Sequence, residues 1–286
     1  MNGKTVLITG ASAGIGLHSA IGLAKLGADV VMVGRDEGRT AQAVALVKSQ
    51  TGNPAISYLL ADLSSLKDVR KLAQEFKDKY QKLDVLLNNA GAIFFTRKLS
   101  VDGYEISLAL NHLNYFLLTD LLLELLKATP AGRIVNVSSR AHYRGHVNFD
   151  DMQSQRGYNP MRAYSMSKLM NVLFTYELAR RLQGTNITAN CLHPGFVASN
   201  FAVNNGWWVR LGMAFMSGRI SVEEGAKCSI YLASSPDMHE LSGKYFNYDM
   251  KEQRSSEESY DEAEAKRLWG ISENLTTMEN DLSSQQ

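Results

Sequence analysis

Tyr164 and Lys168 are the two residues whose types and spacing most clearly suggest chemistry. They stand four positions apart in a stretch, 161–182, whose pattern predicts a helix, so both side chains lie on one face, one turn apart. A free phenol has a pKa of about 10, too high for efficient proton transfer at neutral pH. A neighbouring ammonium favours the phenolate and lowers that pKa. We therefore expect Tyr164 to transfer a proton and Lys168 to activate it.

Two further polar residues could join this pair. Ser139 follows the apolar run 134–138, and its hydroxyl could donate a hydrogen bond to a substrate oxygen on which charge develops. Asn111 lies within a predicted long helix over 104–127. Each residue taken singly also has a structural interpretation, such as a strand-end serine or a buried, hydrogen-bonded asparagine. The catalytic prediction therefore depends on their joint occurrence.

A glycine-rich stretch, TGASAGIG at residues 9–16, follows the first apolar run. Gly10, Gly14 and Gly16 permit a tight turn, close approach of a ligand and close packing of a helix on a strand, respectively. A helix that begins near Ile15 would point free N–H groups and the positive end of its dipole at one place, which suits a pyrophosphate. Considered alone, an ordinary strand-to-helix turn is an equally good explanation.

The elements that must position these residues alternate along the chain. Short β-branched runs predict strands at 5–9, 29–33, 55–60, 85–88, 134–138, 188–192 and 244–246. Longer amphipathic patterns predict helices at 15–26, 37–50, 65–80, 104–127, 161–182 and 222–233. This order predicts an α/β fold: a doubly wound, Rossmann-type parallel sheet of seven strands with helices on both faces, in a single domain over 1–250.

Residues 251–286 differ in composition, being rich in Glu, Ser, Asp and Gln. We expect a polar C-terminal extension, partly disordered, with a short solvated helix over 261–269.

The polar motifs all follow predicted strands. In an open parallel sheet, ligands bind beyond the carboxyl ends of the strands, because the loops diverge there and helix N-termini face the crevice. TGASAGIG, Asp62, NNAG (88–91), Ser139 and HPG (193–195) each stand at such an end. The sequence therefore predicts one ligand site at this edge of the sheet.

Bulk properties narrow the partners and the compartment. A net charge of +1 and a pI of about 7.8 give no broad attraction to polyanions, so we expect no nucleic-acid binding. Two cysteines provide neither a disulfide framework nor a Cys-rich metal site, which favours a reducing, cytoplasmic setting. The amino terminus lacks a signal-peptide pattern, and the longest apolar run, 115–126, is short of the ~20 residues of a membrane span. We expect no integral membrane segment.

No metal is expected either. His142 and His146 are one helical turn apart, but Gly145 intervenes and no third ligand stands at metal spacing. We interpret His112 and His193 as structural.

Taken in order, these motifs resemble those of the short-chain dehydrogenase/reductase family. TGxxxGIG, NNAG, Asn111, the VSS that ends at Ser139, Tyr164-Ser-Met-Ser-Lys168 and HPG carry the resemblance, which runs from about residue 4 to about residue 248. It implies an NAD(P)-binding Rossmann catalytic domain. In the family, the lysine also holds the nicotinamide ribose, the serine binds the substrate oxygen, and the asparagine positions a water that connects the lysine to solvent.

The resemblance also implies the residues that contact the cofactor. These are Gly10, Ser12, Gly14, Ile15, Gly16, Arg35, Asp62, Leu63, Asn89, Ala90, Gly91, Tyr164, Lys168, Pro194, Gly195, Val197 and Ser199. Asp62 and Leu63 resemble the pair that contacts adenine, although Asp62 could instead cap the next helix.

The choice of cofactor depends on the end of the second strand. An acid at the strand tip holds the ribose 2′-OH of NAD, whereas an arginine accommodates the 2′-phosphate of NADP. Gly34 occupies the position where NAD-preferring relatives usually carry an acid, and Arg35 follows. We therefore expect NADP (NADPH) rather than NAD, although Asp36 and the absence of a basic residue at Ala13 count against this preference.

The variable parts must select the substrate. Between Ser139 and Tyr164 lie 24 residues, about twice the separation usual in the family, which implies an enlarged wall beside the pocket. The stretch 207–216 is rich in aromatic residues and Met. Such a composition is expected of an apolar ligand site, of a peripheral membrane contact, or of a helix packed on the core. Several stretches, including NHLNYFLLTDLLL, look like the retinol dehydrogenase branch, whose substrates are bulky lipophilic alcohols and aldehydes.

The leading hypothesis is therefore an NADP-dependent oxidoreductase that interconverts a hydrophobic alcohol and its aldehyde or ketone. One alternative is an enzyme like light-driven protochlorophyllide reductase, although that branch lacks a serine where Ser139 stands. The other is a catalytically silent protein that senses a dinucleotide, against which the intact set of four residues argues. Relatives often pair through the two helices that carry Asn111 and Tyr164, so both a homodimer and a monomer remain open.

Overall fold

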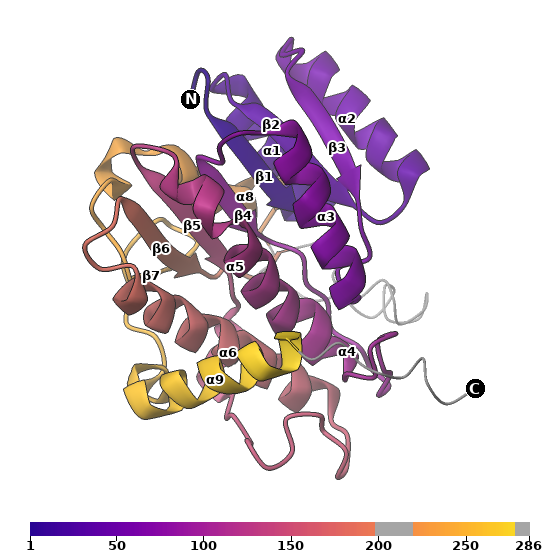
Figure 1. The fold of residues 1–286 in the computed structure, drawn as a ribbon, viewed down its shortest axis with the longest axis vertical. Helices are drawn as coiled ribbons and strands as arrows, with labels where there is room; N and C mark the ends of the chain where they lie inside the picture. The colour runs from indigo at the N-terminus through magenta and orange to yellow at the C-terminus, as the bar shows by residue number, and fades with distance from the viewer. Residues whose placement is uncertain (198–219, 278–286) are drawn as a thin grey trace.

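The computed structural model describes residues 1–197 and 220–277, which form a seven-stranded, entirely parallel sheet (Figure 1). The strand order is β3-β2-β1-β4-β5-β6-β7. The strands are β1 (Thr5–Thr9), β2 (Asp29–Gly34), β3 (Ile56–Leu60), β4 (Val85–Asn88), β5 (Gly132–Val137), β6 (Ile187–Leu192) and β7 (Tyr245–Phe246). The predicted doubly wound fold is confirmed.

Helices cover both faces of the sheet. One face carries α1 (Gly14–Lys25), α2 (Glu37–Thr51) and α8 (Val222–Ser234). The other carries α3 (Leu66–Lys79), α4 (Ile106–Leu108), α5 (Asn114–Lys127), α6 (Pro160–Arg181) and α9 (Glu262–Thr277). Because both faces are covered, the strands are continuous apolar runs rather than alternating ones; all five residues of β1 are buried.

The strand order reverses between β1 and β4, and this reversal places the ligand crevice. Chain connections leave β1 toward β2 on one side and β4 toward β5 on the other, so the loops after β1 and β4 diverge. Thr9 holds the two strand ends together, since its hydroxyl oxygen accepts hydrogen bonds from the backbone N–H groups of Asn89 and Ala90, at 2.8 and 3.0 Å. Two of the predicted motifs therefore meet at one point.

The predicted helix over 104–127 is a composite. It contains α4, a π-helical turn at Ala109–Leu113 and α5. The continuous helix Ile106–Lys127 is long and apolar enough to cross a membrane by length and composition, unlike the shorter run 115–126 considered in the sequence. Of its apolar window, 72% is buried inside the protein, as in the core helix of a globular domain.

The C-terminal helix α9 is longer than the stretch predicted at 261–269, and one of its faces is not solvated. Ala265 and Leu268 belong to the main hydrophobic core, and the Trp269 ring packs on Phe116 of α5 and Phe174 of α6, with ring centres 4.9 and 5.8 Å apart. Figure 1 shows α9 lying across α6. This helix therefore covers part of the surface through which the family resemblance implied pairing.

Candidate active site

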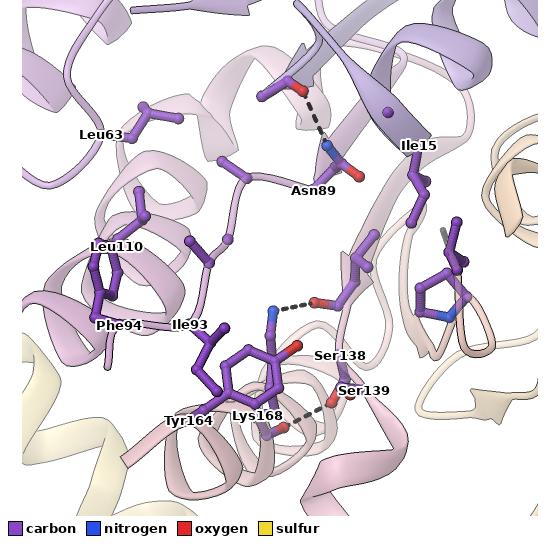
Figure 2. A pocket seen from close by; sticks show the side chains of 18 of the residues that line it. Ile15, Leu63, Asn89, Ile93, Phe94, Leu110, Ser138, Ser139, Tyr164 and Lys168 are labelled. Carbon is purple, nitrogen blue, oxygen red and sulfur yellow. Dashed lines mark hydrogen bonds between the residues drawn. The ribbon is translucent and has the colours of Figure 1, made fainter. Parts of the chain in front are cut away.

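A cavity of about 1080 Å³ opens at the carboxyl ends of the strands (Figure 2). Its walls come from the loops after β1, β2, β3, β4, β5 and β6 and from the first turns of α6. The ligand site predicted from the polar motifs lies at this edge. The cavity extends from the tip of β2 to the side chains of Tyr164 and Lys168, so one elongated ligand could reach from one to the other.

The N-terminus of α1 forms one end of the cavity. Gly10 adopts a left-handed conformation with φ +65°, which the turn out of β1 requires. Gly16 packs so tightly that a Cβ there would stand 2.5 Å from the carbonyl oxygen of Gly10, which ties the helix to the strand. The N-cap residue of α1 is Ala13, which has no side-chain acceptor, whereas α2 is capped by Asp36. The first N–H groups of α1 are thus left for a ligand, and a pyrophosphate fits this donor set.

Tyr164, Ser139 and Lys168 converge at the other end of the cavity. Tyr164 and Lys168 lie on one face of α6, and the amine of Lys168 is 5.8 Å from the centre of the Tyr164 ring. That amine donates a hydrogen bond to the carbonyl oxygen of Val137, at 3.0 Å. The Ser138 hydroxyl donates to the carbonyl oxygen of Lys168, at 2.7 Å, and so fixes α6 against the end of β5. Figure 2 shows the hydroxyl of Tyr164 on the same side as the Lys168 amine.

The protonation states of this group depend mainly on burial. Burial raises the pKa of Tyr164 above its ordinary value, while a hydrogen bond with Ser139 acts in the opposite direction. Burial lowers the pKa of Lys168 to about 7. The expectation that the lysine lowers the pKa of the phenol is therefore not met in the protein alone. The reason is that the low-dielectric surroundings disfavour both charged forms.

Asn111 lies behind the cavity rather than in its wall. It is fully buried in the π turn, where its amide bonds to both backbone groups of Ala92, at 2.9 and 3.0 Å. The same amide donates to the hydroxyl of Ser167, at 3.0 Å, and that hydroxyl donates to the carbonyl oxygen of Tyr164. Asn111 therefore joins the loop after β4 to the helix that carries Tyr164.

Most predicted site residues line this one cavity. They are Gly10, Ser12, Gly14, Ile15, Arg35, Asp62, Leu63, Asn89, Ala90, Gly91, Ser139, Tyr164, Lys168, Pro194, Gly195 and Val197. Gly16 and Asn111 are the two described exceptions, and both act from behind the wall. Ser199 and the stretch 207–216 lie outside the described residues.

The tip of β2 presents two arginines, of which the sequence analysis named one. Arg35 and Arg39 both line the cavity, and both are largely exposed. A carboxylate oxygen of Asp36 accepts a hydrogen bond from the backbone N–H of Arg39, at 2.9 Å, so this acid caps α2. Asp62 does not cap α3, whose cap is Ser65; instead it accepts hydrogen bonds from Ser64 and pairs with Arg35 at 3.6 Å. The four-residue spacing of the two arginines was the available signal for Arg39.

An apolar wall near Tyr164 was also missed. It consists of Ile93, Phe94, Ile106, Leu110, Met161 and Phe196. The apolar run IFF at 93–95, one residue after NNAG, was a signal for its first part.

The long segment between Ser139 and Tyr164 contributes Met161 to this wall and supports the rest of it from outside. Arg97 donates to the carbonyl oxygen of Gln153, at 3.1 Å, and the Tyr158 hydroxyl donates to that of Phe94, at 2.7 Å. The segment thereby holds the loop 93–105 in place, as the predicted enlargement of the wall implied.

The histidines near the cavity have structural partners. His142 is buried, its Nδ1 lies 2.7 Å from the carbonyl oxygen of Ser139, and burial lowers its pKa to about 4. His146 pairs instead with Glu258. Within residues 1–197 and 220–277, no cluster of three potential metal ligands is found.

A family model described as short chain dehydrogenase matches residues 4–209. The chain belongs to the short-chain dehydrogenase family. Among curated relatives, retinol dehydrogenase 14 of Homo sapiens is 43% identical over 293 residues, an alignment that covers 96% of this chain and 86% of the relative. Polyprenol dehydrogenase of Homo sapiens is 37% identical over 281 residues, covering 96% and 85%. As a member of this family with retinol dehydrogenases among its relatives, the chain is an oxidoreductase.

Solved structures agree with this assignment. An uncharacterized protein from Mycobacterium Paratuberculosis is 35% identical with a TM-score of 0.79, covering 97% of this chain and 94% of that one. RhlG of Pseudomonas aeruginosa, solved as an active-site complex with NADP, is 28% identical with a TM-score of 0.70, covering 87% and 96%.

Proposed function

We propose that this short-chain dehydrogenase is NADP-dependent and interconverts a lipophilic alcohol and its aldehyde or ketone. One observation carries the proposal: the Tyr164 and Lys168 side chains and the Ser139 hydroxyl meet inside a cavity whose adjoining wall is apolar. Polar groups that converge at one end of an apolar pocket orient a largely hydrophobic ligand by its single reactive oxygen.

Ser139 and Tyr164 would act on that oxygen in different ways. A bound nicotinamide supplies or accepts the hydride. The Ser139 hydroxyl lines the cavity; it hydrogen-bonds with Tyr164, and its oxygen accepts a further hydrogen bond from the N–H of Ala141, at 3.2 Å. That hydroxyl can stabilise charge on the substrate oxygen. Tyr164, held protonated by burial, would donate its proton to the oxygen in the reductive direction and be left as the phenolate; in the oxidative direction the phenolate form would take the proton of the alcohol.

Lys168 fits the role of holding a ribose. Its amine is buried at the floor of the cavity, and a Cβ on Gly91 would stand 3.0 Å from it. The backbone after β4 therefore approaches the amine closely, and a side chain at Gly91 would press on the amine and on Asn111. A hydroxyl of the sugar would accept from the amine that now donates to Val137.

The substrate class is supported by the apolar wall and by the relatives. Retinol dehydrogenase 14 and polyprenol dehydrogenase are named for isoprenoid alcohols. In this chain Phe94 and Leu110 line the cavity, Phe94 being buried. Burial of an extended isoprenoid chain against such side chains would contribute about 25 cal/mol per Å² of apolar surface.

The preference for NADP is supported by the two arginines at the tip of β2. Arg35 and Arg39 both line the cavity, where they would flank a ribose 2′-phosphate, and the Asp36 carboxylate caps α2. The Arg35–Asp62 pair is exposed, and exposed pairs contribute only about 0–1 kcal/mol, so a phosphate can take over the guanidinium.

Arg35→Ala is therefore expected to weaken NADP binding about tenfold to a hundredfold, because a charge-assisted hydrogen bond is lost. The affinity for NAD should change little. The dissociation constants of both cofactors, measured by fluorescence titration, test this. Lys48→Ala removes a positive charge at the far end of α2 and is the matched control. Equal losses for NADP and NAD in Arg35→Ala would refute the assignment.

The activity itself is tested with the purified full chain and a panel of carbonyls. We expect NADPH consumption, followed at its absorbance maximum in darkness, with long-chain and isoprenoid aldehydes and much less with short polar ones. Turnover in darkness excludes the light-driven alternative. Consumption that is confined to small polar carbonyls would contradict the lipophilic substrate class.

A further inference from the structure

The C-terminal helix α9 contacts the part of the active site that carries Asn111. The π turn Ala109–Leu113 widens the helix by one residue, and such single turns often occur at functional sites. A π turn has poorer hydrogen-bond geometry than the α-helix on either side, so it depends on contacts from neighbouring elements. His112, next to Asn111, supplies the central contact.

The contact is a buried hydrogen bond between His112 and Ser272. The Nε2 atom of His112 and the hydroxyl oxygen of Ser272 are 2.8 Å apart, and neither residue is exposed. The same hydroxyl donates its single proton to the carbonyl oxygen of Leu268, at 2.8 Å. Since a hydroxyl has one proton, Ser272 must accept from His112, which fixes the histidine as the Nε2–H tautomer. Burial lowers the pKa of His112 to about 4, so the ring stays neutral at physiological pH.

Two further hydrogen bonds reach α9, one from the segment that leads into the π turn and one from α3. The Tyr104 hydroxyl donates to the carbonyl oxygen of Leu275, at 2.9 Å. The guanidinium of Arg70, on α3, donates to the carbonyl oxygen of Thr276. Both acceptors belong to the last turns of α9, just after Ser272. Residues 104–113 are thus attached to α9 at their beginning and near their end.

This segment forms part of the active site. Ile106 and Leu110 line the cavity, and Asn111 links Ala92 to Ser167, which in turn bonds to the backbone of Tyr164. A rotation of the π turn that released His112 would also displace Asn111, because the two residues are consecutive. It would thereby loosen the loop after β4 and the first turns of α6.

We propose that α9 is a positioning element of the active site, acting through Ser272. The Ser272 hydroxyl holds the neutral ring of His112 and, through it, the arrangement of the π turn that presents Asn111 to Ala92 and Ser167. His112 and Ser272 are positioning residues, since neither reaches the cavity. The catalytic part of this inference depends on the proposed function.

The test compares Ser272→Ala with Thr276→Val. Both variants remove one buried hydroxyl from the same face of α9, but the Thr276 hydroxyl bonds only to Ser272 and Glu273 of its own helix. In Ser272→Ala we expect amide hydrogen exchange in 106–113 to rise about tenfold and kcat to fall about three- to tenfold. The KM for NADPH should not change. Ser272→Thr, which keeps the hydroxyl, should restore both values.

The readouts separate the failure of this inference from that of the proposed function. Amide exchange in 106–113 reports the His112–Ser272 contact even if the unmutated protein turns over no carbonyl. Absence of turnover would refute the proposed function alone. Equal effects of Ser272→Ala and Thr276→Val on exchange, kcat and melting temperature would overturn the positioning role, as would unchanged exchange in 106–113.

Discussion

Tyr164→Phe is expected to lower kcat by at least about a hundredfold while leaving the dissociation constant of NADPH nearly unchanged. The substitution removes only the hydroxyl at the end of the cavity where Ser139 and Lys168 converge. Two neighbouring phenols are engaged elsewhere: the Tyr115 ring is fully buried and its hydroxyl donates to Val137, and the hydroxyl of Tyr143, which also lines the cavity, donates to the carbonyl oxygen of Arg254. Stopped turnover with retained binding is the signature of a lost proton donor.

Steady-state rates of NADPH consumption and a fluorescence titration of cofactor measure the two quantities. Tyr231→Phe, which removes a hydroxyl from the surface of α8, is the control and should behave like the unmutated protein. If Tyr164→Phe keeps more than a tenth of the activity, another group donates the proton. If the unmutated chain binds NADPH but reduces nothing in a wide carbonyl panel, the dinucleotide-sensing alternative is the better account.

The sequence predicted the sheet and the position of the site well, for a physical reason. Strands buried on both faces, such as β1, must be short and continuously apolar, and helices between them must be amphipathic, so each element is visible in a local window. The polar motifs had to lie at strand ends, and Ser139 and Asn89 do so. Local patterns thus determine both the fold class and the edge at which the ligand binds.

The features that the sequence missed depend on contacts between distant residues. His112 and Asn111 look like polar interruptions of an apolar helix, whereas their partners Ser272 and Ser167 stand 160 and 56 positions away. The packing of Trp269 on the core was hidden because α9 is polar in composition and only one of its faces is apolar. The raised pKa of Tyr164 follows from the depth of the cavity, which no spacing reveals.

The burial of Lys168 lowers the stability of the folded protein, although the same residue is proposed to be needed for activity. Its pKa is about 7 in the folded protein, against an ordinary value of 10.5. Between these two pH values the unfolded chain holds a proton that the folded chain has lost, so the free energy of unfolding rises with pH across this window. Below pH 7 the folded protein must keep a buried ammonium, and the full destabilisation is present.

Lys168→Met is therefore expected to be inactive and yet more stable than the unmutated chain when both are measured without cofactor. Methionine fills a similar volume and carries no charge into the interior. Since each pH unit of the window corresponds to about 1.4 kcal/mol, the gain in unfolding free energy at pH 6 is on the order of 5 kcal/mol, and it falls to about 2 kcal/mol at pH 9.

Chemical denaturation at a series of pH values measures this difference, with Lys71→Met as the control. Lys71 is 72% exposed on α3, so its amine remains in water in both states and its replacement should give no pH-dependent change. A stability difference for Lys168→Met that stays constant from pH 6 to pH 9 would mean that the amine is not desolvated in the folded protein. Because the two phenols beside it, Tyr115 and Tyr164, both have raised pKa values, neither supplies a negative charge that could offset the cost of burying the ammonium. The cofactor-free protein thus carries a destabilising lysine whose amine donates a hydrogen bond to Val137, and under the proposed function a ribose hydroxyl would be its second acceptor.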